Sequence, residues 1–329
     1  MTFDKYCIVT TQQTARGLIA AANRILILTH VSPDGDALGS LLGLHWALKA
    51  SGKETLPVSA DGCPDTFRFL PGSSEIRNRV NDTYDLAIVL DCADLPRAGK
   101  PAESLAGPPD LNIDHHATNP GFGRLNFVYP EAASTAEIIF DLLPAFKLPL
   151  TQPAAECLLC GVVSDTLGFR TSNTTAKVLT TAQKLMAAGA DLPRIYDHAL
   201  NRRSFIAVQL WGQALNRAAL DGGIAWTTIP LSIKQAVGYN GKGDADLINV
   251  LTTINEANVF LIFVEHENNE VKVSWRARPG WDVAKIAQSF GGGGHVSAAG
   301  ANLKNITLAE AEEKVLAATR QMMNASREL

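Results

Sequence analysis

Short apolar runs alternate with polar loops and helix-like stretches along the first part of the chain. Residues 24–29 are aliphatic and show no polar alternation, which is typical of a strand that is covered on both faces. From Asp36 a helical spacing of apolar residues begins with an acid and ends at Gly52. This strand, loop and helix form half of a βαβ unit.

The same order repeats further along the chain. Strand candidates lie near Thr55 and in the runs that end at Asp91 and His116. Helical patterns are predicted at three places: 134–146, 152–164 and 174–188. A doubly wound, mainly parallel sheet is the economical arrangement of these elements, so the fold class is α/β.

The pattern changes after residue 190. Residues 191–218 are predicted as an amphipathic helical connector with an arginine-rich polar face. Strands are predicted at 224–229, 259–264 and 271–278, helices near Leu231 and Asp246 and from Asp282, and a capped terminal helix from Thr307. We therefore expect a first domain at 1–190, a connector at 191–218, and a smaller α/β domain with a mixed sheet at 219–329, with a cleft between the domains.

Composition and charge narrow the class of protein. The chain of 329 residues has a formal net charge of −4, which argues against a broad basic face for long duplex nucleic acid and favours a short anionic partner. No apolar run reaches the roughly 18 residues that a membrane span requires. The five cysteines are scattered and no secretory leader is evident, so we expect a cytoplasmic protein.

Acids and imidazoles stand at the ends of apolar runs in four successive segments, where an open parallel sheet places functional side chains. The candidate metal ligands are His30, Asp34, Asp36, Asp91, His115 and Asp165. Carboxylates with imidazoles suit two octahedral divalent ions, manganese most of all, or magnesium. Asp91 is the candidate bridging ligand, because it ends a central strand.

A pair of divalent ions would cancel the charge of the four carboxylates, polarise a phosphoryl oxygen and activate a water, which indicates phosphoester hydrolysis. Simpler explanations exist for single motifs. A D-x-D pair at a helix start is commonly an N-cap, and C-L-L-C at Cys157 and Cys160 has no partner pair at zinc spacing, so these thiols are expected in a helix core.

A second informative segment lies near the end of the chain. Strand alternation predicts Ser274, Arg276 and Arg278 on one face and Val273 and Trp275 on the other. The glycines that follow allow close approach of the backbone, and the small residues after His295 are predicted to begin a helix that cradles a phosphate. The alternative is a glycine-rich turn beside a solvated basic strand.

The motifs D-G-D-A-L-G-S, V-L-D, D-H-H, V-S-D and F-G-G-G-G-H-V-S-A-A-G resemble the DHH phosphoesterase superfamily with its DHH-associated C-terminal domain. The resemblance spans nearly the whole chain. The compact length is similar to that of the bacterial nano-RNase branch, oligoribonucleases that often also dephosphorylate 3'-phosphoadenosine 5'-phosphate.

The resemblance implies a role for each matching residue. One metal would be held by His30, Asp34 and Asp91, and the other by Asp36, Asp91, His115 and Asp165. His116 would face the scissile phosphate and Asp114 would orient its neighbours. The substrate's terminal phosphate or base would be bound by Arg276, Gly292, Gly293, Gly294 and His295, with Arg278 beside them.

We therefore expect an enzyme, a dimetal phosphodiesterase that cleaves short oligonucleotides to nucleoside 5'-monophosphates. A phosphatase of 3'-phosphoadenosine 5'-phosphate and a hydrolase of linear or cyclic dinucleotides use the same centre and stay open as alternatives. A non-catalytic nucleotide sensor is disfavoured because all six metal ligands are present. The helical connector and apolar edges also suggest a homodimer.

Overall fold

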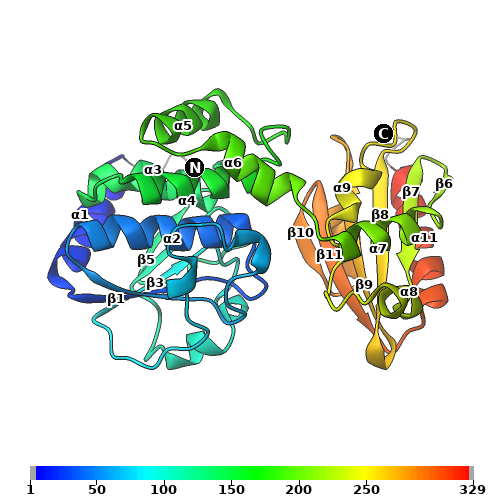
Figure 1. The fold of residues 1–329 in the computed structure, drawn as a ribbon, viewed down its shortest axis with the longest axis horizontal. Helices are drawn as coiled ribbons and strands as arrows, with labels where there is room; N and C mark the ends of the chain where they lie inside the picture. The colour runs from blue at the N-terminus through cyan, green and yellow to red at the C-terminus, as the bar shows by residue number, and fades with distance from the viewer. Residues whose placement is uncertain (1–4, 326–329) are drawn as a thin grey trace. The chain divides into compact units, whose positions relative to one another are not determined.

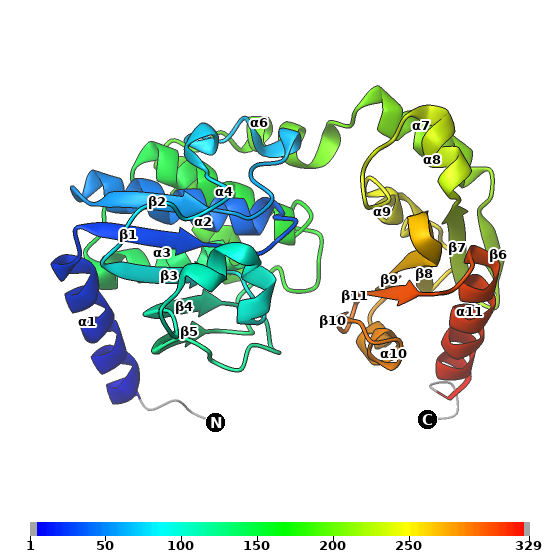
Figure 2. The same ribbon diagram turned by 90° about the horizontal axis from the view of Figure 1, so that it is seen from below.

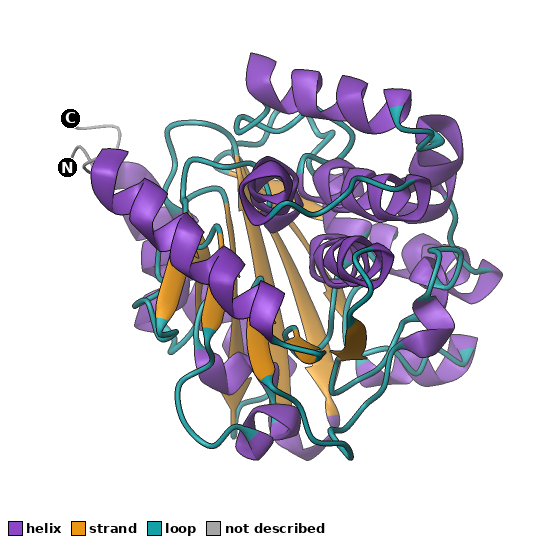
Figure 3. Ribbon diagram, turned by 90° about the vertical axis from the view of Figure 1, so that its left-hand side faces the viewer, coloured by secondary structure: helices purple, strands orange, loops and turns teal. Residues whose placement is uncertain are grey.

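The computed structural model describes residues 5–325 and divides the chain into two compact units, Met1–Arg202 and Arg203–Leu329 (Figure 1). Each unit has its own sheet and its own hydrophobic core. Figure 3 separates helices, strands and loops by colour. Among the described residues, none of the helices combines the length and the apolar character that crossing a membrane would require.

The N-terminal unit is built on a five-stranded parallel sheet with the order β2-β1-β3-β4-β5, so the expected parallel sheet is confirmed. Its strands are β1 (Arg24–Leu28), β2 (Glu54–Val58), β3 (Leu86–Leu90), β4 (Leu111–Asp114) and β5 (Leu125–Val128). Its α-helices are α1 (Lys5–Ala21), α2 (Gly35–Ala50), α3 (Thr135–Phe146), α4 (Gln152–Asp165), α5 (Ala176–Ala187) and α6 (Leu192–Tyr196). The short 3₁₀ helices are η1 (Asp65–Phe67), η2 (Ser73–Glu75), η3 (Leu95–Ala98) and η4 (Lys100–Ser104).

Both faces of this sheet are buried. Ile25 and Ile27 of β1 belong to the core that one face of the sheet shares with α1, α2, α3 and α4. Figures 1 and 2 show these helices beside the sheet in two views. Leu26 and Leu28 point to the other face, which is covered by η3, η4 and loops. Successive residues of a strand face opposite sides, so burial on both sides explains why β1 is aliphatic throughout.

The close crossing of α2 and α4 depends on Gly39 of α2. A Cβ added to Gly39 would lie 2.5 Å from the carbonyl oxygen of Cys157 and 2.7 Å from the backbone nitrogen of Gly161. Because these are backbone atoms, neither can move aside without shifting α4. Cys157 and Cys160 are fully buried in α4 with free thiols, which confirms that they belong to a helix core.

The C-terminal unit has a six-stranded mixed sheet with the order β10-β11-β9-β8-β7-β6, in which only β7 and β8 run parallel, as expected for this domain. The strands are β6 (Ala219–Asp221), β7 (Ile224–Ile229), β8 (Val259–His266), β9 (Glu270–Ala277), β10 (Gly293–His295) and β11 (Ala298–Lys304). The helices are α7 (Phe205–Leu215), α8 (Leu231–Val237), α9 (Leu247–Leu251), η6 (Glu267–Asn269), α10 (Val283–Ser289) and α11 (Leu308–Ala325). Figure 2 shows α7, α8 and α9 on one side of the sheet and α10 and α11 on the other.

Two predicted elements differ from the structure. The expected continuous helical stretch at 191–218 consists of α6, a π-helical segment η5 (Asp197–Asn201) and α7, because the Ser204 hydroxyl accepts a hydrogen bond from the Ala207 nitrogen and starts a new helix. Ile195 packs in the first unit and Leu210 in the second.

The glycine-rich segment is also not followed by a helix. The small residues after His295 form strand β11, which pairs with β9 along its whole length and with β10. A Cβ on Gly292 would lie 2.1 Å from the carbonyl oxygen of Gly300, so this glycine allows the close approach of the two segments. The expected helix N-terminus for phosphate binding is therefore wrong. Helix α1 and the strands β5 and β6 are further elements that the sequence pattern did not predict.

Replacing Gly39 by Ala should destabilise the protein by about 1–3 kcal/mol, because the new methyl group overpacks the backbone of α4. The matched control is Gly17→Ala in α1, where nothing lies within 4 Å of the added Cβ and a gain of about 0.5–1 kcal/mol is expected. Denaturant unfolding of both variants measures the difference. Equal stability of the two variants would contradict the close crossing.

Candidate metal centre

The six candidate metal ligands predicted from the sequence lie together at the carboxyl edge of the parallel sheet. His30 follows β1, Asp91 follows β3 and His115 follows β4, and these three strands are neighbours. Asp34 and Asp36 lie at the start of α2, and Asp165 is the last residue of α4. The sequence analysis grouped Asp165 with the strand ends, but the helix predicted at 152–164 leads directly to it, and the structure confirms this helix as α4, whose last residue is Asp165.

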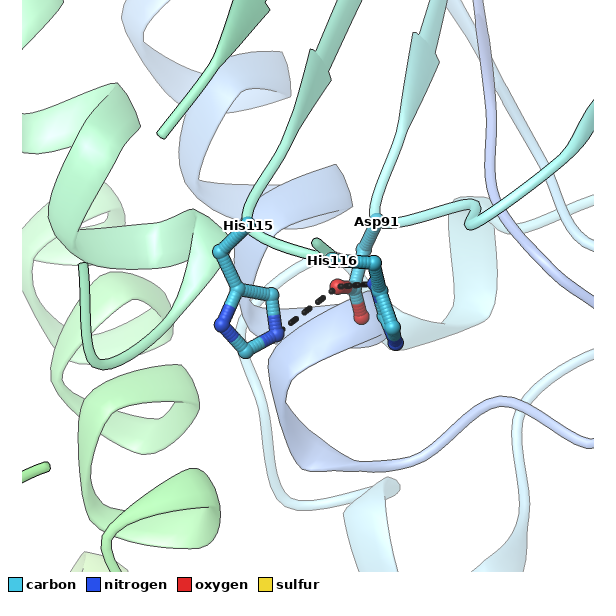
Figure 4. A group of neighbouring side chains, drawn as sticks. All are labelled: Asp91, His115 and His116. Carbon is cyan, nitrogen blue, oxygen red and sulfur yellow. Dashed lines mark ion pairs between the residues drawn. The ribbon is translucent and has the colours of Figure 1, made fainter. Parts of the chain in front are cut away.

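Asp91 stands at the middle of the group (Figure 4). Its Oδ2 lies 3.5 Å from Nε2 of His30, and its Oδ1 lies 3.6 Å from Nε2 of His115. The two oxygens of one buried carboxylate thus face two different imidazoles. The backbone of Asp91 is left-handed, with φ of 56°, and its nitrogen donates to the carbonyl of Ile113 on β4. Such a conformation is strained for a residue other than glycine and persists only where its surroundings hold it.

The first group of potential ligands is His30, Asp34 and Asp91, whose ligand atoms all lie within 4.8 Å of one another. Nδ1 of His30 is 2.8 Å from the carbonyl of Val31, so Nε2 is the ring atom that faces the carboxylates. Asp34 is also the N-cap of α2, because its Oδ1 accepts from the nitrogens of Asp36 and Ala37. The capping role and the potential ligand role therefore belong to the same side chain.

The second group is Asp36, His115 and Asp165. Nε2 of His115 lies 3.2 Å from Oδ2 of Asp165 and 4.0 Å from Oδ2 of Asp36. Together with the contact to Asp91, this imidazole faces three carboxylates. Three of the four residues that the family resemblance implied for the second metal thus lie together, and Asp91 forms a further group of potential ligands with His115 and His116.

Asp36 is fixed by the start of α3. Its two carboxylate oxygens accept from the nitrogens of Thr135 at 2.6 Å and Ala136 at 3.0 Å, and Oδ1 also accepts from the hydroxyl of Ser40. The positive end of the α3 dipole therefore stabilises the ionised acid. The hydroxyl of Thr135 donates to Oδ1 of Asp91 as well.

Sequence reasoning missed Thr135 because its role comes from a helix that begins far along the chain. The only local signal was the cap: the hydroxyl of Ser134 accepts from the nitrogen of Glu137, which marks the start of α3. That signal places a helix N-terminus in the sequence, but it does not say which acid the N-terminus meets.

The protonation equilibria show how crowded the charges are. Burial and the neighbouring carboxylates of Asp91 and Asp165 raise the pKa of Asp36 well above its usual range. Burial and nearby acids also raise the pKa of Asp165. Burial opposes ionisation of Asp91 too, but its contacts with His30 and His115 outweigh this and lower its pKa. Burial alone would lower the pKa of His30, yet the hydrogen bond to Asp91 and the charge of Asp34 raise it to about 9.

These shifts have one physical meaning. Buried carboxylates that lie close together are stabilised by any nearby positive charge. Within this group of six residues, only the imidazoles of His30 and His115 can carry one. Oxygen and imidazole donors gathered around an excess of negative charge are the donor set that Mn²⁺ and Mg²⁺ prefer. The residues present therefore fit divalent metal ions.

Asp114 and His116 complete the D-H-H motif. Asp114 is fully buried, and its Oδ1 accepts from the backbone nitrogen of His115 and lies 2.7 Å from Nδ1 of His116. Nδ1 of His116 is also 3.8 Å from Oδ1 of Asp91 (Figure 4). The contact of Nδ1 with the buried carboxylate of Asp114 fixes the orientation of the His116 ring.

In the C-terminal unit, the side chains of β9 alternate between a buried face and a partly exposed face. Val273 and Trp275 are fully buried on one face of β9, and Ser274 and Arg276 are partly exposed on the other, as the alternation predicted. Burial lowers the pKa of Arg276, with the charge of Asp244 opposing this effect.

The guanidinium of Arg276 donates to one backbone carbonyl, that of its neighbour Trp275, whereas that of Arg278 makes two such contacts with other segments. Arg278 lies beyond the strand, where its guanidinium donates to the carbonyls of Ala257 and Ile254 and lies over the ring of Phe260. These contacts connect neighbouring segments of the unit itself. The backbone of residues 292–295 belongs to the β10 hairpin, and the side chain of His295 lies outside the described part of the chain.

Replacing Asp91 by Asn should weaken manganese binding by more than about 100-fold, because the charge at the middle of the group is lost. Isothermal titration of the metal-free protein with MnCl₂ measures this, and the wild type should bind two ions per chain. The matched control is Asp94→Asn, which removes the same charge at an exposed 3₁₀ N-cap. An Asp91 variant that binds manganese like the Asp94 variant would contradict the assignment.

Comparison with known proteins gives close relatives over nearly the whole chain. It is 39% identical over 311 residues to the "Bifunctional oligoribonuclease and PAP phosphatase NrnA" of Thermus thermophilus, covering 93% of this chain and 92% of the relative. It is 30% identical over 299 residues to the protein of the same name from Bacillus subtilis, covering 87% of this chain and 91% of that relative. A cyclic-di-AMP phosphodiesterase, GdpP of Geobacillus thermodenitrificans, is 28% identical over 91% of this chain and 48% of its own length.

Solved structures agree on the fold. An exopolyphosphatase-related protein from Bacteroides fragilis superposes with a TM-score of 0.85 at 25% identity, covering 96% of both chains. RecJ of Thermus thermophilus, solved in complex with Mn²⁺, has a TM-score of 0.54 at 14% identity, covering 97% of this chain and 55% of that one, and shares the fold alone.

Two domain families match the chain, one in each of the units that contain the two sheets. Residues 24–162, which include five of the six candidate metal ligands, match the DHH family, N-terminal domain. Residues 230–325 match the DHHA1 domain. With these two matches and a 39% identical relative along 93% of its length, the chain belongs to the DHH family of phosphoesterases and carries a DHHA1 domain.

Proposed function

We propose that this protein is a dimetal phosphodiesterase that hydrolyses short oligonucleotides to nucleoside 5'-monophosphates. The observation that carries the proposal is the position of Asp91, whose two oxygens face two different groups of potential ligands. The names of the relatives from Thermus thermophilus and Bacillus subtilis, each an oligoribonuclease and PAP phosphatase, support the substrate class.

In this proposal Asp91 is shared between two metal ions. One ion would be held by His30, Asp34 and Asp91, and the other by Asp36, Asp91, His115 and Asp165. Manganese is the proposed native metal, and magnesium fits the same donors. When bound, such a pair polarises phosphoryl oxygens and lowers the pKa of a coordinated water.

The protein's own residues would orient the reaction around this centre. Because Asp114 holds Nδ1 of His116 and so orients the ring, Nε2 would face the scissile phosphate and give a proton to the leaving oxygen. The left-handed backbone of Asp91 and the anchoring of Asp36 by α3 keep the carboxylates in place before the substrate arrives. Such preorganisation avoids a rearrangement during the reaction.

Arg276 is the proposed group for the terminal phosphate or base of the substrate. It is the arginine of β9 that lies on the partly exposed face, and a guanidinium can hold a phosphate with two hydrogen bonds. Residues 292–295 would add close backbone contacts and the imidazole of His295. The contacts of Arg278 with backbone carbonyls favour a structural role for that residue instead.

A second activity, removal of the 3'-phosphate from 3'-phosphoadenosine 5'-phosphate, is proposed for the same centre. The names of the relatives support it, because each combines an oligoribonuclease with a PAP phosphatase. Hydrolysis of cyclic dinucleotides is a further alternative, since GdpP is a cyclic-di-AMP phosphodiesterase. These reactions differ in the substrate, and each would use the same metal-binding residues.

Further expectations concern the length of the substrate, the cellular location and the oligomeric state. A net charge of −4 is in keeping with short substrates in place of long duplexes. The described cysteines Cys63, Cys92, Cys157 and Cys160 are free thiols, as a reducing cytoplasm requires. The cytoplasmic location and the homodimer stay predictions.

With MnCl₂ the purified protein should turn over at least one member of a panel that contains a dinucleotide, a five-nucleotide RNA, a cyclic dinucleotide and 3'-phosphoadenosine 5'-phosphate. Chromatography of the products identifies both the substrate and the nucleoside monophosphate released. Short RNA should be cleaved faster than a long duplex.

Exhaustive chelation is the control for this experiment, since it should abolish turnover and added manganese should restore it. Turnover that survives complete metal removal would reject the dimetal mechanism, and inactivity on the entire panel would reject the proposed enzyme.

Arg276→Ala should raise KM for short RNA by about 10-fold or more with a smaller change in kcat, because a charged hydrogen bond to the substrate is lost. The matched variant is Arg278→Ala, which should lower the melting temperature while KM stays unchanged, since its guanidinium supports the unit's own backbone. Steady-state kinetics and thermal unfolding separate the two effects. A raised KM in Arg278→Ala together with an unchanged KM in Arg276→Ala would contradict the proposed roles of the two arginines.

A further inference from the structure

The amide side chain of Asn119 lies at the centre of a hydrogen-bond network behind the metal centre. This residue follows the D-H-H motif, and its backbone nitrogen donates to the carbonyl of His116 in a tight turn. Its side chain is only partly buried. No sequence motif indicated a role for it.

The nitrogen Nδ2 of Asn119 meets both loops that carry the D-H-H motif and the central acid. It donates to Oδ2 of Asp114 at 2.7 Å and to the carbonyl of Cys92 at 2.9 Å. Asp114 in turn uses its other oxygen, Oδ1, for the backbone of His115 and for Nδ1 of His116. The amide therefore controls the rotation of the carboxylate that orients both histidines.

The contact with Cys92 acts on the other loop. Cys92 directly follows Asp91, whose backbone is left-handed with φ of 56°. A hydrogen bond to the carbonyl of Cys92 restrains the peptide that follows Cys92, one residue beyond this strained position, while the nitrogen of Asp91 is held by Ile113. The same Asn119 amide thus helps to fix the end of β3 and the end of β4 relative to each other.

The orientation of this amide is itself determined. Its oxygen Oδ1 accepts from the backbone nitrogen of Gly121 at 2.8 Å and from Nδ2 of Asn112 at 3.0 Å. A flipped amide would place its NH₂ group against these two donors and its oxygen against the carbonyl of Cys92 and the carboxylate of Asp114. Only the observed orientation satisfies all of these partners.

We infer that Asn119 is a positioning residue for the metal centre: by donating to Asp114 and to the Cys92 carbonyl, it holds Asp91 and the two histidines of the D-H-H motif in the geometry that binds metal. This inference rests on the proposed function for its meaning in catalysis. Its effect on metal affinity can be measured without any substrate. Partners that orient ligands typically change metal affinity or activity by about 10–100-fold.

Asn119→Asp tests this with an almost identical shape. The new carboxylate cannot donate, and one of its oxygens would face the Cys92 carbonyl and the Asp114 carboxylate. Manganese affinity, measured by isothermal titration of the metal-free protein, should fall by about 10–100-fold. For whichever substrate the wild type cleaves, kcat should fall while KM changes little, because Asn119 is not proposed to touch substrate.

The matched control is Asn126→Asp on β5. Asn126 belongs to the same network, since its Oδ1 accepts from Asn112 and from the nitrogen of Gly123, but its Nδ2 donates only to the carbonyl of Gly123. It receives the same added charge without a contact to Asp114 or Cys92 in the described hydrogen bonds. Its manganese affinity and kcat should equal those of the wild type.

Asn119→Ala separates the lost donor from the added charge. It should weaken manganese binding in the same direction as Asn119→Asp, with circular dichroism and metal-free unfolding showing a folded protein; if the Asp variant does not fold, the Ala variant decides alone. Wild-type manganese affinity in Asn119→Ala, or equal losses in Asn119→Asp and Asn126→Asp, would overturn the inference. A wild type that binds manganese but cleaves nothing would reject the proposed function and leave this test intact.

Discussion

The mutual repulsion of four carboxylates gathered at one edge of a sheet is the constraint on which the N-terminal unit depends. Asp36 and Asp91 are almost completely buried, so water cannot screen them from each other. The opposing pKa shifts of these two acids express that conflict, because one is protonated more easily and the other is held ionised by imidazoles. Divalent cations resolve the conflict with the charge and the geometry that oxygen and imidazole donors favour.

The surrounding structure serves to hold these acids in place. The N-terminus of α3 offers two backbone donors to Asp36, and the glycine crossing of α2 and α4 brings the start of one helix close to the end of the other. Behind the histidines, Asn119 and Asp114 form a fully paired polar network. A partly paired network at this depth would be costly, since buried polar groups without partners lose their hydration without compensation.

The C-terminal unit is simpler in its chemistry. One face of β9 is apolar and packs in the core with α10 and α11, and the other presents Arg276. The close pairing of β10, β11 and β9 leaves a sheet edge with small side chains, in which glycine is needed for contact between backbones. The two units thus contribute different groups: the N-terminal unit supplies the six candidate metal ligands, and the DHHA1 domain of the C-terminal unit supplies the candidate guanidinium.

The sequence by itself determined the parallel sheet and the identity of the six candidate ligands, because aliphatic runs that end in acids or imidazoles are local patterns and parallel strands end at one edge. It misplaced the segment after His295 in a helix, since short runs of small residues do not reveal their pairing partners. Only the tertiary structure decided that Thr135 and Asn119 meet Asp91, Asp36 and Asp114. The contacts of Thr135 with Asp36 and Asp91 join residues far apart in the chain, and the contact of Asn119 with Asp114 depends on the turn between these two residues, so no local periodicity records either.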